Sequence, residues 1–165
     1  MEWVERSPQK GIEFIEALAG EFDLLNDMAD KKLIPIQHEI DLCKKHLEIM
    51  SFRKEVAYEW QDENIDQTQL IPPAILHTLV ENGITHSKTP SNGKIKFKLS
   101  AENMDNTVKY SLKVFATDRG GNSSGSGTGL KYIRSRLTES YGKNWSLESG
   151  ETNNGWLTEI KIQKM

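Results

Sequence analysis

The sequence predicts an α+β fold: a two-layer α/β sandwich with a mixed, largely antiparallel sheet, preceded by an N-terminal helix. Three observations predict it. Apolar residues recur at helical spacing in four segments, and they alternate with polar residues in five others. The order is two helices, a strand, a helix, two strands, a helix and a hairpin. This order differs from the repeated strand–helix order of a doubly wound parallel sheet.

The first helix is predicted to follow Ser7, which is a suitable N-cap, with Pro8 as its first helical residue. Residues 30–32 and Pro35 predict a break after it. One face of this helix is an apolar stripe with spacings of three and four residues, made of Ile12, Ile15, Leu18, Phe22, Leu25 and Met28. The sequence leaves open whether this stripe packs on the rest of the chain or forms a dimerisation surface.

A second helix and a strand are predicted next. The helix has one apolar side, formed by Ile36, Ile40, Cys43, Leu47 and Met50. Apolar and polar residues alternate from Val56 to Trp60, which indicates a strand. Pro72 and Pro73 precede a third helix, whose apolar residues are Ile75, Leu76, Leu79, Val80 and Ile84.

The C-terminal half is predicted to contain four strands and one helix. Two strands, 94–100 and 108–117, are separated by a polar turn at 102–106. A Gly/Ser-rich loop at 120–129 then precedes a helix over 130–141. Strands at 145–148 and 156–162 close the chain, with Asn153, Asn154 and Gly155 as their hairpin turn.

Composition excludes several classes of protein. The chain has 165 residues, enough for one domain with a helical appendage, and its formal charge of -3 does not suit a nucleic-acid binder that neutralises phosphates. One cysteine, Cys43, excludes an internal disulfide and a multi-cysteine zinc site, and it fits a reducing compartment. No apolar run reaches the roughly 20 residues of a membrane span, and the N-terminus lacks the apolar core of a signal peptide. We therefore expect a soluble intracellular chain.

Three polar motifs are candidates for chemistry. In the first, Thr78, Asn82 and His86 share one face of the third helix. An Asn carbonyl oxygen suits Mg²⁺, and His86 could donate to a phosphate oxygen. The alternative is an ordinary solvated helix face.

The second and third motifs flank the glycine-rich loop. Asp118 ends a strand beside Gly120 and Gly121, where it could present its carboxylate to a ligand or simply form a turn. Three alternating glycines before a helix, at positions 125, 127 and 129, could cradle an anion such as phosphate. Their spacing matches neither the dinucleotide fingerprint nor the P-loop, and a flexible linker is the alternative.

In this order the motifs resemble the ATP-binding (HATPase) domain of sensor histidine kinases, in the LytS/YehU-like branch of the GHKL, or Bergerat-fold, group. Residues 71–86 resemble the N box with its Pro-Pro lead-in, Asp118-Arg-Gly-Gly the G1 box, and residues 125–137 the G2 box and its helix. Residues 34–53 resemble the first helix of the ATP-binding domain, and residues 7–30 the second dimerisation helix. The resemblance implies that residues 1–32 are a remnant of the helical dimerisation and phosphoacceptor domain and 33–165 the ATP-binding catalytic domain.

The resemblance implies ATP and Mg²⁺ as cofactors and assigns roles to individual residues. Asn82 would ligate Mg²⁺, and Glu81 and His86 would lie beside the triphosphate as catalytic residues. Asp118 would accept a hydrogen bond from the adenine amino group, and Gly120 would let the ring approach. The segment from Gly121 to Ser126 would be a short ATP lid. The remaining cofactor-binding residues would belong to the phosphate loop and its helix: Gly125, Gly127, Thr128, Gly129 and Leu130.

Three departures from the family pattern affect the expected activity. The Asn-Pro-His-Phe-type phosphoacceptor motif is missing, and none of the four histidines (His38, His46, His77 and His86) has its context. Thr78 occupies the position where ATPases of the wider group have a general-base Glu, so efficient ATP hydrolysis is not expected. Asn122 replaces the last glycine of the G1 box. We therefore expect a portion of a larger protein that does not autophosphorylate alone.

The implied function is that of a two-component sensor histidine kinase. The chain would donate the γ-phosphate of ATP to a histidine upstream of residue 1, for relay to a response regulator of the LytTR type. The full-length protein would be a homodimer in the inner membrane with this chain in the cytoplasm, in contact with neither membrane nor nucleic acid. Two alternatives stay open: a degenerate, non-catalytic Bergerat-fold module for dimerisation or protein interaction, and a serine kinase like anti-sigma factors.

Overall fold

A five-stranded mixed sheet forms one layer of the molecule. The computed structural model describes residues 8–54, 56–87, 93–116 and 128–164. The strands, in spatial order, are β2 (Ala57–Glu63), β4 (Lys94–Met104), β5 (Thr107–Phe115), β7 (Gly155–Gln163) and β6 (Trp145–Thr152). β2 pairs with β4 in parallel, and the other three pairings are antiparallel. The predicted mixed, largely antiparallel sheet is confirmed.

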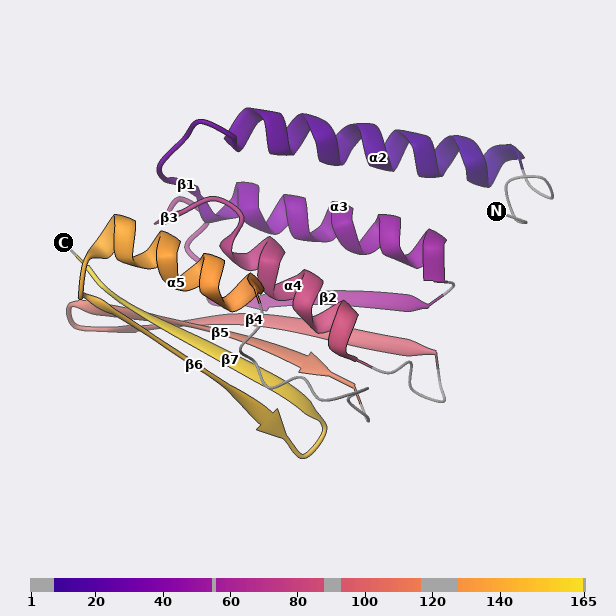
Figure 1. Ribbon diagram of the computed structural model, residues 1–165. Coiled ribbons are helices and arrows are strands. Elements are labelled where there is room, and N and C mark those ends of the chain that lie inside the picture. The colour runs from indigo at the N-terminus through magenta and orange to yellow at the C-terminus, as the bar shows by residue number, and fades with distance from the viewer. Residues whose placement is uncertain (1–7, 55, 88–92, 117–127, 165) are drawn as a thin grey trace.

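Three helices form the second layer. Figure 1 shows α3 (Ile36–Lys54), α4 (Ile75–His86) and α5 (Thr128–Tyr141) side by side over one face of the sheet. A further helix, α2 (Pro8–Met28), lies along α3 on the side away from the sheet. The predicted two-layer sandwich with an added N-terminal helix is therefore confirmed. Among the described helices, none combines the length and apolar character that crossing a bilayer requires.

The main core lies between the sheet and these three helices. Buried and less buried residues alternate along β4 and β5, as expected where one face of a sheet is covered. The helix α4 lies especially close to the sheet at Gly83, where an added Cβ would be 2.8 Å from the ring of Phe97 and 3.1 Å from Val114. The position of α4 relative to the sheet is therefore fixed by close packing.

Two short strands connect the starts of α3 and α4, and the sequence did not indicate them. β1 (Ile34–Pro35) pairs antiparallel with β3 (Leu70–Ile71). Each has only two residues, too few for an alternating pattern to be recognised. Their pairing brings the segment before α4 next to the start of α3.

The long strands extend beyond their predicted ends. β4 continues to Met104 and β6 to Thr152, so the turn predicted at 102–106 shrinks to Asp105 and Asn106. Asp105 has a positive φ of 35°, which such a tight turn requires. Few apolar side chains are buried at these strand ends, which pair through their backbones, and a hydropathy pattern does not register such pairing.

The apolar stripe predicted on α2 does not act as one packing face. Ile12, Ile15 and Phe22 are 50%, 65% and 63% exposed, whereas Met28 is buried. Contact with α3 depends instead on Phe14 and Ala17, which form with Ile49 a small cluster separate from the main core. The stripe spirals around α2 because spacings of three residues fall behind the helical period of 3.6.

Candidate functional site

The helix α4 carries the first predicted motif, and a buried carboxylate from α3 caps its N-terminus. Glu39 is fully buried. Its two oxygens accept hydrogen bonds from the backbone N–H groups of Ala74 at 2.9 Å, Leu76 at 2.7 Å and His77 at 3.3 Å. These N–H groups belong to the start of the helix, where no intrahelical acceptor exists. Glu39 thus fixes the start of α4 and the direction in which its polar face points.

Opposing effects act on the Glu39 carboxyl group. Burial raises its pKa, and the three backbone hydrogen bonds partly offset that increase. The sequence analysis missed Glu39. A signal was present, because an acidic residue at position 39 lies beside Ile36 and Ile40 on the apolar side of the predicted helix.

On the polar face of α4, the first residue is already engaged with the backbone. Thr78 Oγ1 donates a hydrogen bond to the carbonyl oxygen of Ala74 at 2.6 Å. The start of this turn is unusual, because Ala74 has φ 65° and ψ 14° in the left-handed region. Thr78 therefore stabilises the first turn of α4, and its hydroxyl group offers no general base.

Asn82, in the middle of this face, lies against the first turn of α5. A Cβ added to Gly129 would be 2.8 Å from both Nδ2 and Oδ1 of Asn82, so a larger residue would displace the amide from this position. A second contact joins the same two regions, because Tyr132 donates a hydrogen bond to the carbonyl oxygen of Pro73 at 3.4 Å. The structure thus brings together residues from two motifs that are 47 positions apart.

The other predicted residues fall into three groups. Leu130 is buried in the main core, where it anchors α5. Glu81 is half exposed, and the partly buried His86 is the last residue of α4. Five predicted residues lie outside the described part of the chain, as does the side chain of Thr128: Asp118, Gly120, Gly121, Gly125 and Gly127.

The described residues suit a phosphate ligand with a hard cation. The amide oxygen of Asn82 is a typical Mg²⁺ ligand. The N-terminus of α5, a helix of 14 residues, begins beside it and offers backbone N–H groups and a positive dipole end to an anion. Gly129 keeps the backbone of that turn within reach of the Asn82 side chain. The described residues therefore fit a phosphate group bound with Mg²⁺.

A second polar cluster lies where α2, α3 and α4 meet. Glu21 Oε1 is 2.8 Å from His46 Nδ1 and 3.2 Å from His77 Nε2. Burial raises the pKa of Glu21, but the two histidines outweigh this and lower it to about 2. The sequence analysis noticed these histidines only for lacking a phosphoacceptor context. Separations of 25 and 56 positions from Glu21 gave no local pattern to find.

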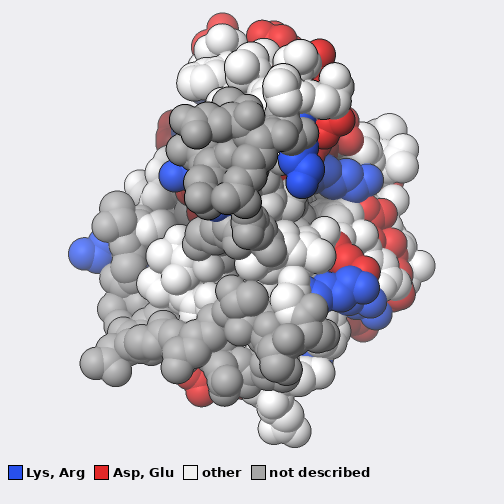
Figure 2. All heavy atoms as spheres, turned by 90° about the vertical axis from the view of Figure 1, so that its right-hand side faces the viewer, with Lys and Arg blue, Asp and Glu red and all other residues white. Residues whose placement is uncertain are grey.

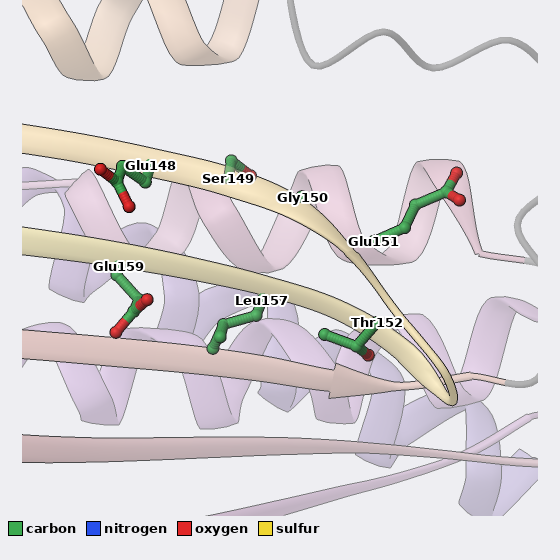
Figure 3. A pocket seen from close by; sticks show the side chains of 7 residues that line it. All are labelled: Glu148, Ser149, Gly150, Glu151, Thr152, Leu157 and Glu159. Atoms are coloured by element: carbon green, nitrogen blue, oxygen red, sulfur yellow. The ribbon is translucent and has the colours of Figure 1, made fainter.

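A shallow hollow lies elsewhere, on the face of the sheet away from the helices. It has a volume of about 260 Å³ and is formed by β6 and β7 (Figure 3). Glu148, Glu151 and Glu159 line it, and their carboxylates would repel a phosphate. This hollow is therefore a poor candidate for a nucleotide site.

Surface charge is mixed on the side of the molecule shown in Figure 2. Lys and Arg side chains lie interspersed with Asp and Glu side chains over the described part of this face. On the outer face of the sheet, cross-strand ion pairs join Lys98 to Glu63 and Lys109 to Glu102 and Glu159. Recognition of a ligand by the described residues thus depends on local geometry more than on a field of one sign.

Comparison with solved structures shows that this architecture is shared with histidine kinase catalytic domains. The catalytic domain of the histidine kinase ThkA matches 80% of this chain and 94% of its own, with a TM-score of 0.57 and 16% identity. Histidine kinase AdeS of Acinetobacter baumannii matches 99% of this chain and 85% of its own, with a TM-score of 0.58 and 13% identity. The histidine kinase domain of the blue-light activated kinase of Erythrobacter litoralis EL346 matches 91% of this chain and 72% of its own, with a TM-score of 0.58 and 14% identity. At these identities the likeness shows the fold.

Sequence comparison adds one curated relative. The uncharacterized protein YwpD of Bacillus subtilis (strain 168) is 30% identical over 115 residues, which is 67% of this chain. The chain spans about two fifths (39%) of the length of that relative. No protein-family model matches the chain.

Proposed function

We propose that this chain is the ATP-binding catalytic domain of a two-component sensor histidine kinase. The observation that carries the proposal is the contact between Asn82 of α4 and the first turn of α5 at Gly129. It joins a magnesium ligand to a helix N-terminus suited to phosphate, within a fold shared with histidine kinase catalytic domains. The resemblance of residues 71–86, 118–121 and 125–137 to the nucleotide-binding boxes supports the same assignment.

Each residue then has a defined task. Asn82 would bind Mg²⁺ through its amide oxygen, and the N–H groups at the start of α5 would hold phosphate oxygens. Glu81 and His86 would lie beside the triphosphate, and Asp118 would accept a hydrogen bond from adenine. Phosphoryl transfer depends mainly on positioning and on neutralising charge, and bound Mg²⁺ supplies much of that neutralisation. Thr78 provides no base for activating water, which favours transfer to a protein acceptor over hydrolysis.

Nucleotide binding is the direct test. Isothermal titration of the chain with a non-hydrolysable ATP analogue and Mg²⁺ should give saturable binding at millimolar nucleotide or below. Asn82→Ala should weaken binding at least about tenfold, a loss of about 1.4 kcal/mol, by removing the magnesium ligand. Asn26→Ala is the matched control, because Asn26 is an exposed helical asparagine on α2. A folded wild-type chain that binds no nucleotide would contradict the proposal.

The proposal extends to the whole signalling protein. The phosphate acceptor would be a histidine upstream of residue 1, and a response regulator of the LytTR type would receive the phosphate from it. The kinase would act as a homodimer at the inner membrane, with this domain in the cytoplasm. Incubating the natural full-length protein with ATP labelled at the γ-phosphate should yield phosphohistidine, and Asn82→Ala should abolish the label.

A second candidate function is supported by α2. Its residues Ile12, Ile15 and Phe22 are large, apolar and at least half exposed, which is typical of an interaction surface. A non-catalytic module working by dimerisation would use this surface. In that case neither the wild-type chain nor Asp118→Asn binds nucleotide. The wild-type chain is then a dimer in sedimentation velocity, and Ile15→Glu converts it to a monomer. Nucleotide binding that Asp118→Asn abolishes would exclude this candidate.

A further inference from the structure

Three helices meet at a cluster of one carboxylate and two imidazoles. Glu21 comes from α2, His46 from α3 and His77 from α4. Their side chains are 14%, 13% and 11% exposed, so the cluster is largely shielded from solvent. The two imidazole rings are nearly perpendicular, at 70°, with centroids 4.7 Å apart. Both rings thus direct a nitrogen at the same carboxylate oxygen.

The distances in this cluster are close to those of a metal site. The three ligand atoms all lie within 4.8 Å of one another, and two of the separations are 2.8 and 3.2 Å. Ligand bonds of about 2.0–2.2 Å place neighbouring donors of a tetrahedral zinc ion roughly 3.3–3.6 Å apart. To admit an ion, the 2.8 Å contact would open by roughly half an ångström and the 3.2 Å contact by roughly a quarter of an ångström, while the two imidazole nitrogens, which lie within 4.8 Å of each other, would turn toward the ion. The imidazole protons that now bridge to Glu21 would leave on binding.

The chemistry of the donors selects the kind of ion. Two imidazole nitrogens and one carboxylate oxygen are a recognised zinc ligand set, whereas Mg²⁺ and Ca²⁺ prefer oxygen donors alone. A fourth position is open to solvent, because the neighbouring Glu81 side chain, whose Oε1 is 3.9 Å from His77 Nε2, is 49% exposed. A water molecule could therefore complete a tetrahedron.

We propose that Glu21, His46 and His77 form a binding site for a divalent transition-metal ion, with Zn²⁺ as the fitting occupant. The site is separate from the magnesium position assigned to Asn82, and it does not depend on the proposed function. A bound ion would fasten α2 to both α3 and α4. It would therefore hold the outer helix in one position relative to the helix that carries Asn82.

Titration of the tag-free chain with zinc chloride tests the site. We expect saturable binding of one zinc ion per chain, unaffected by an excess of Mg²⁺. Each of the variants Glu21→Gln, His46→Gln and His77→Gln should weaken zinc binding at least about tenfold, because a loss of this size follows even when a residue that only hydrogen-bonds to a metal ligand is replaced. His38→Gln is the matched control, because His38 is exposed on α3 outside the cluster, and it should bind zinc like the wild type.

A spectroscopic measurement on the wild-type chain keeps the test independent of how well the variants fold. Co²⁺ in a tetrahedral site with histidine and carboxylate ligands gives visible absorption bands, and stoichiometric Zn²⁺ should remove them by displacing Co²⁺. Three results would overturn the proposal: no saturable binding of zinc, a Co²⁺ spectrum of octahedral type, or zinc binding lost in His38→Gln but retained in His46→Gln. In each case the cluster is only a hydrogen-bonded triad that holds α2 in place.

Discussion

At the level of single side chains, the contact between Asn82 and Gly129 has the clearest functional meaning. The absence of one Cβ atom at position 129 creates the space that the Asn82 amide occupies. This pair therefore offers a way to alter ligand binding without altering the fold.

We predict that Gly129→Ala weakens binding of the ATP analogue at least about tenfold while leaving the melting temperature unchanged or higher. The new methyl group would displace the Asn82 amide, whereas alanine is up to about 1 kcal/mol better than glycine within a helix. Titration calorimetry and thermal unfolding of the same preparation measure the two effects. Gly150→Ala is the control, because a Cβ there meets no atom within 4 Å. Equal losses of affinity in both variants would contradict the assignment.

A second prediction concerns Tyr110, a core residue of β5 that is 2% exposed. Its hydroxyl oxygen is buried and has no hydrogen-bond partner among the described residues. Burial of the group also raises its pKa well above the ordinary value. We expect Tyr110→Phe to raise the free energy of unfolding by about 1 kcal/mol, because an unsatisfied polar group leaves the core. Denaturant unfolding measures this. Tyr132→Phe, which removes a hydrogen bond to the carbonyl oxygen of Pro73, should instead lower the free energy of unfolding slightly.

Among the elements, α4 depends on a cap supplied by another helix. Its N-terminus has no side-chain cap of its own, and Glu39 of α3 satisfies its backbone instead. The packing of α3 against α4 and the direction of the Asn82 face are thus determined by one buried carboxylate.

Replacement of this carboxylate should be strongly destabilising. We predict that Glu39→Ala lowers the free energy of unfolding by about 3 kcal/mol or more, because three N–H groups lose a charged acceptor inside the protein. The stability of Glu39→Gln should lie between those of the wild type and Glu39→Ala, since the glutamine amide retains one acceptor oxygen. Chemical denaturation compares them with Glu48→Ala, an exposed position on the same helix whose ion pair with Lys45 is worth less than about 1 kcal/mol. A small effect of Glu39→Ala would show that the cap is dispensable.

The helices and long strands could be predicted because each has a local signal. Helical spacing indicated α3, α4 and α5, and alternation indicated the central strands. Glu39 shows where this reasoning ends, because the N–H groups that donate to its carboxylate belong to residues 35 to 38 positions further along the chain. The same holds for Glu21 and its two histidines. For the candidate site, the motif order indicated Asn82 and Gly129, but their contact depends on how α5 packs beside α4.

At the scale of the whole molecule, the described residues form two separate apolar clusters. The main core joins the sheet to three helices, and a small cluster of Phe14, Ala17 and Ile49 joins α2 to α3. Residues at the C-terminal end of α2 reach the main core, where Met28 is buried. The N-terminal half of α2 is thus the part least tied to the domain.

We predict that Phe14→Ala loosens α2 without unfolding the domain. Removal of a buried Phe ring costs about 3 kcal/mol, and here the loss falls on the small cluster. Amide hydrogen exchange over residues 8–28 should accelerate by about 100-fold, the equivalent of 2.8 kcal/mol, while β4 and β5 stay protected. Phe22→Ala, at a position 63% exposed, should leave exchange unchanged. Equal acceleration throughout the molecule would show that both clusters unfold together.

The parallel pairing of β2 with β4 has a consequence for the order in which the chain folds. β4 and β5 are joined by a two-residue turn, and β6 and β7 by another, so both hairpins close over short loops. β2 pairs Ala57 with Lys94, and the whole of α4 lies between them in sequence. Closing a long loop costs more conformational entropy before any contact is gained. The pairing of β5 with β7 closes a loop of similar length, from Phe115 to Gly155, with α5 between them. We therefore expect each hairpin to form early, and β2 and the second hairpin to join β4 and β5 late, as α4 and α5 dock.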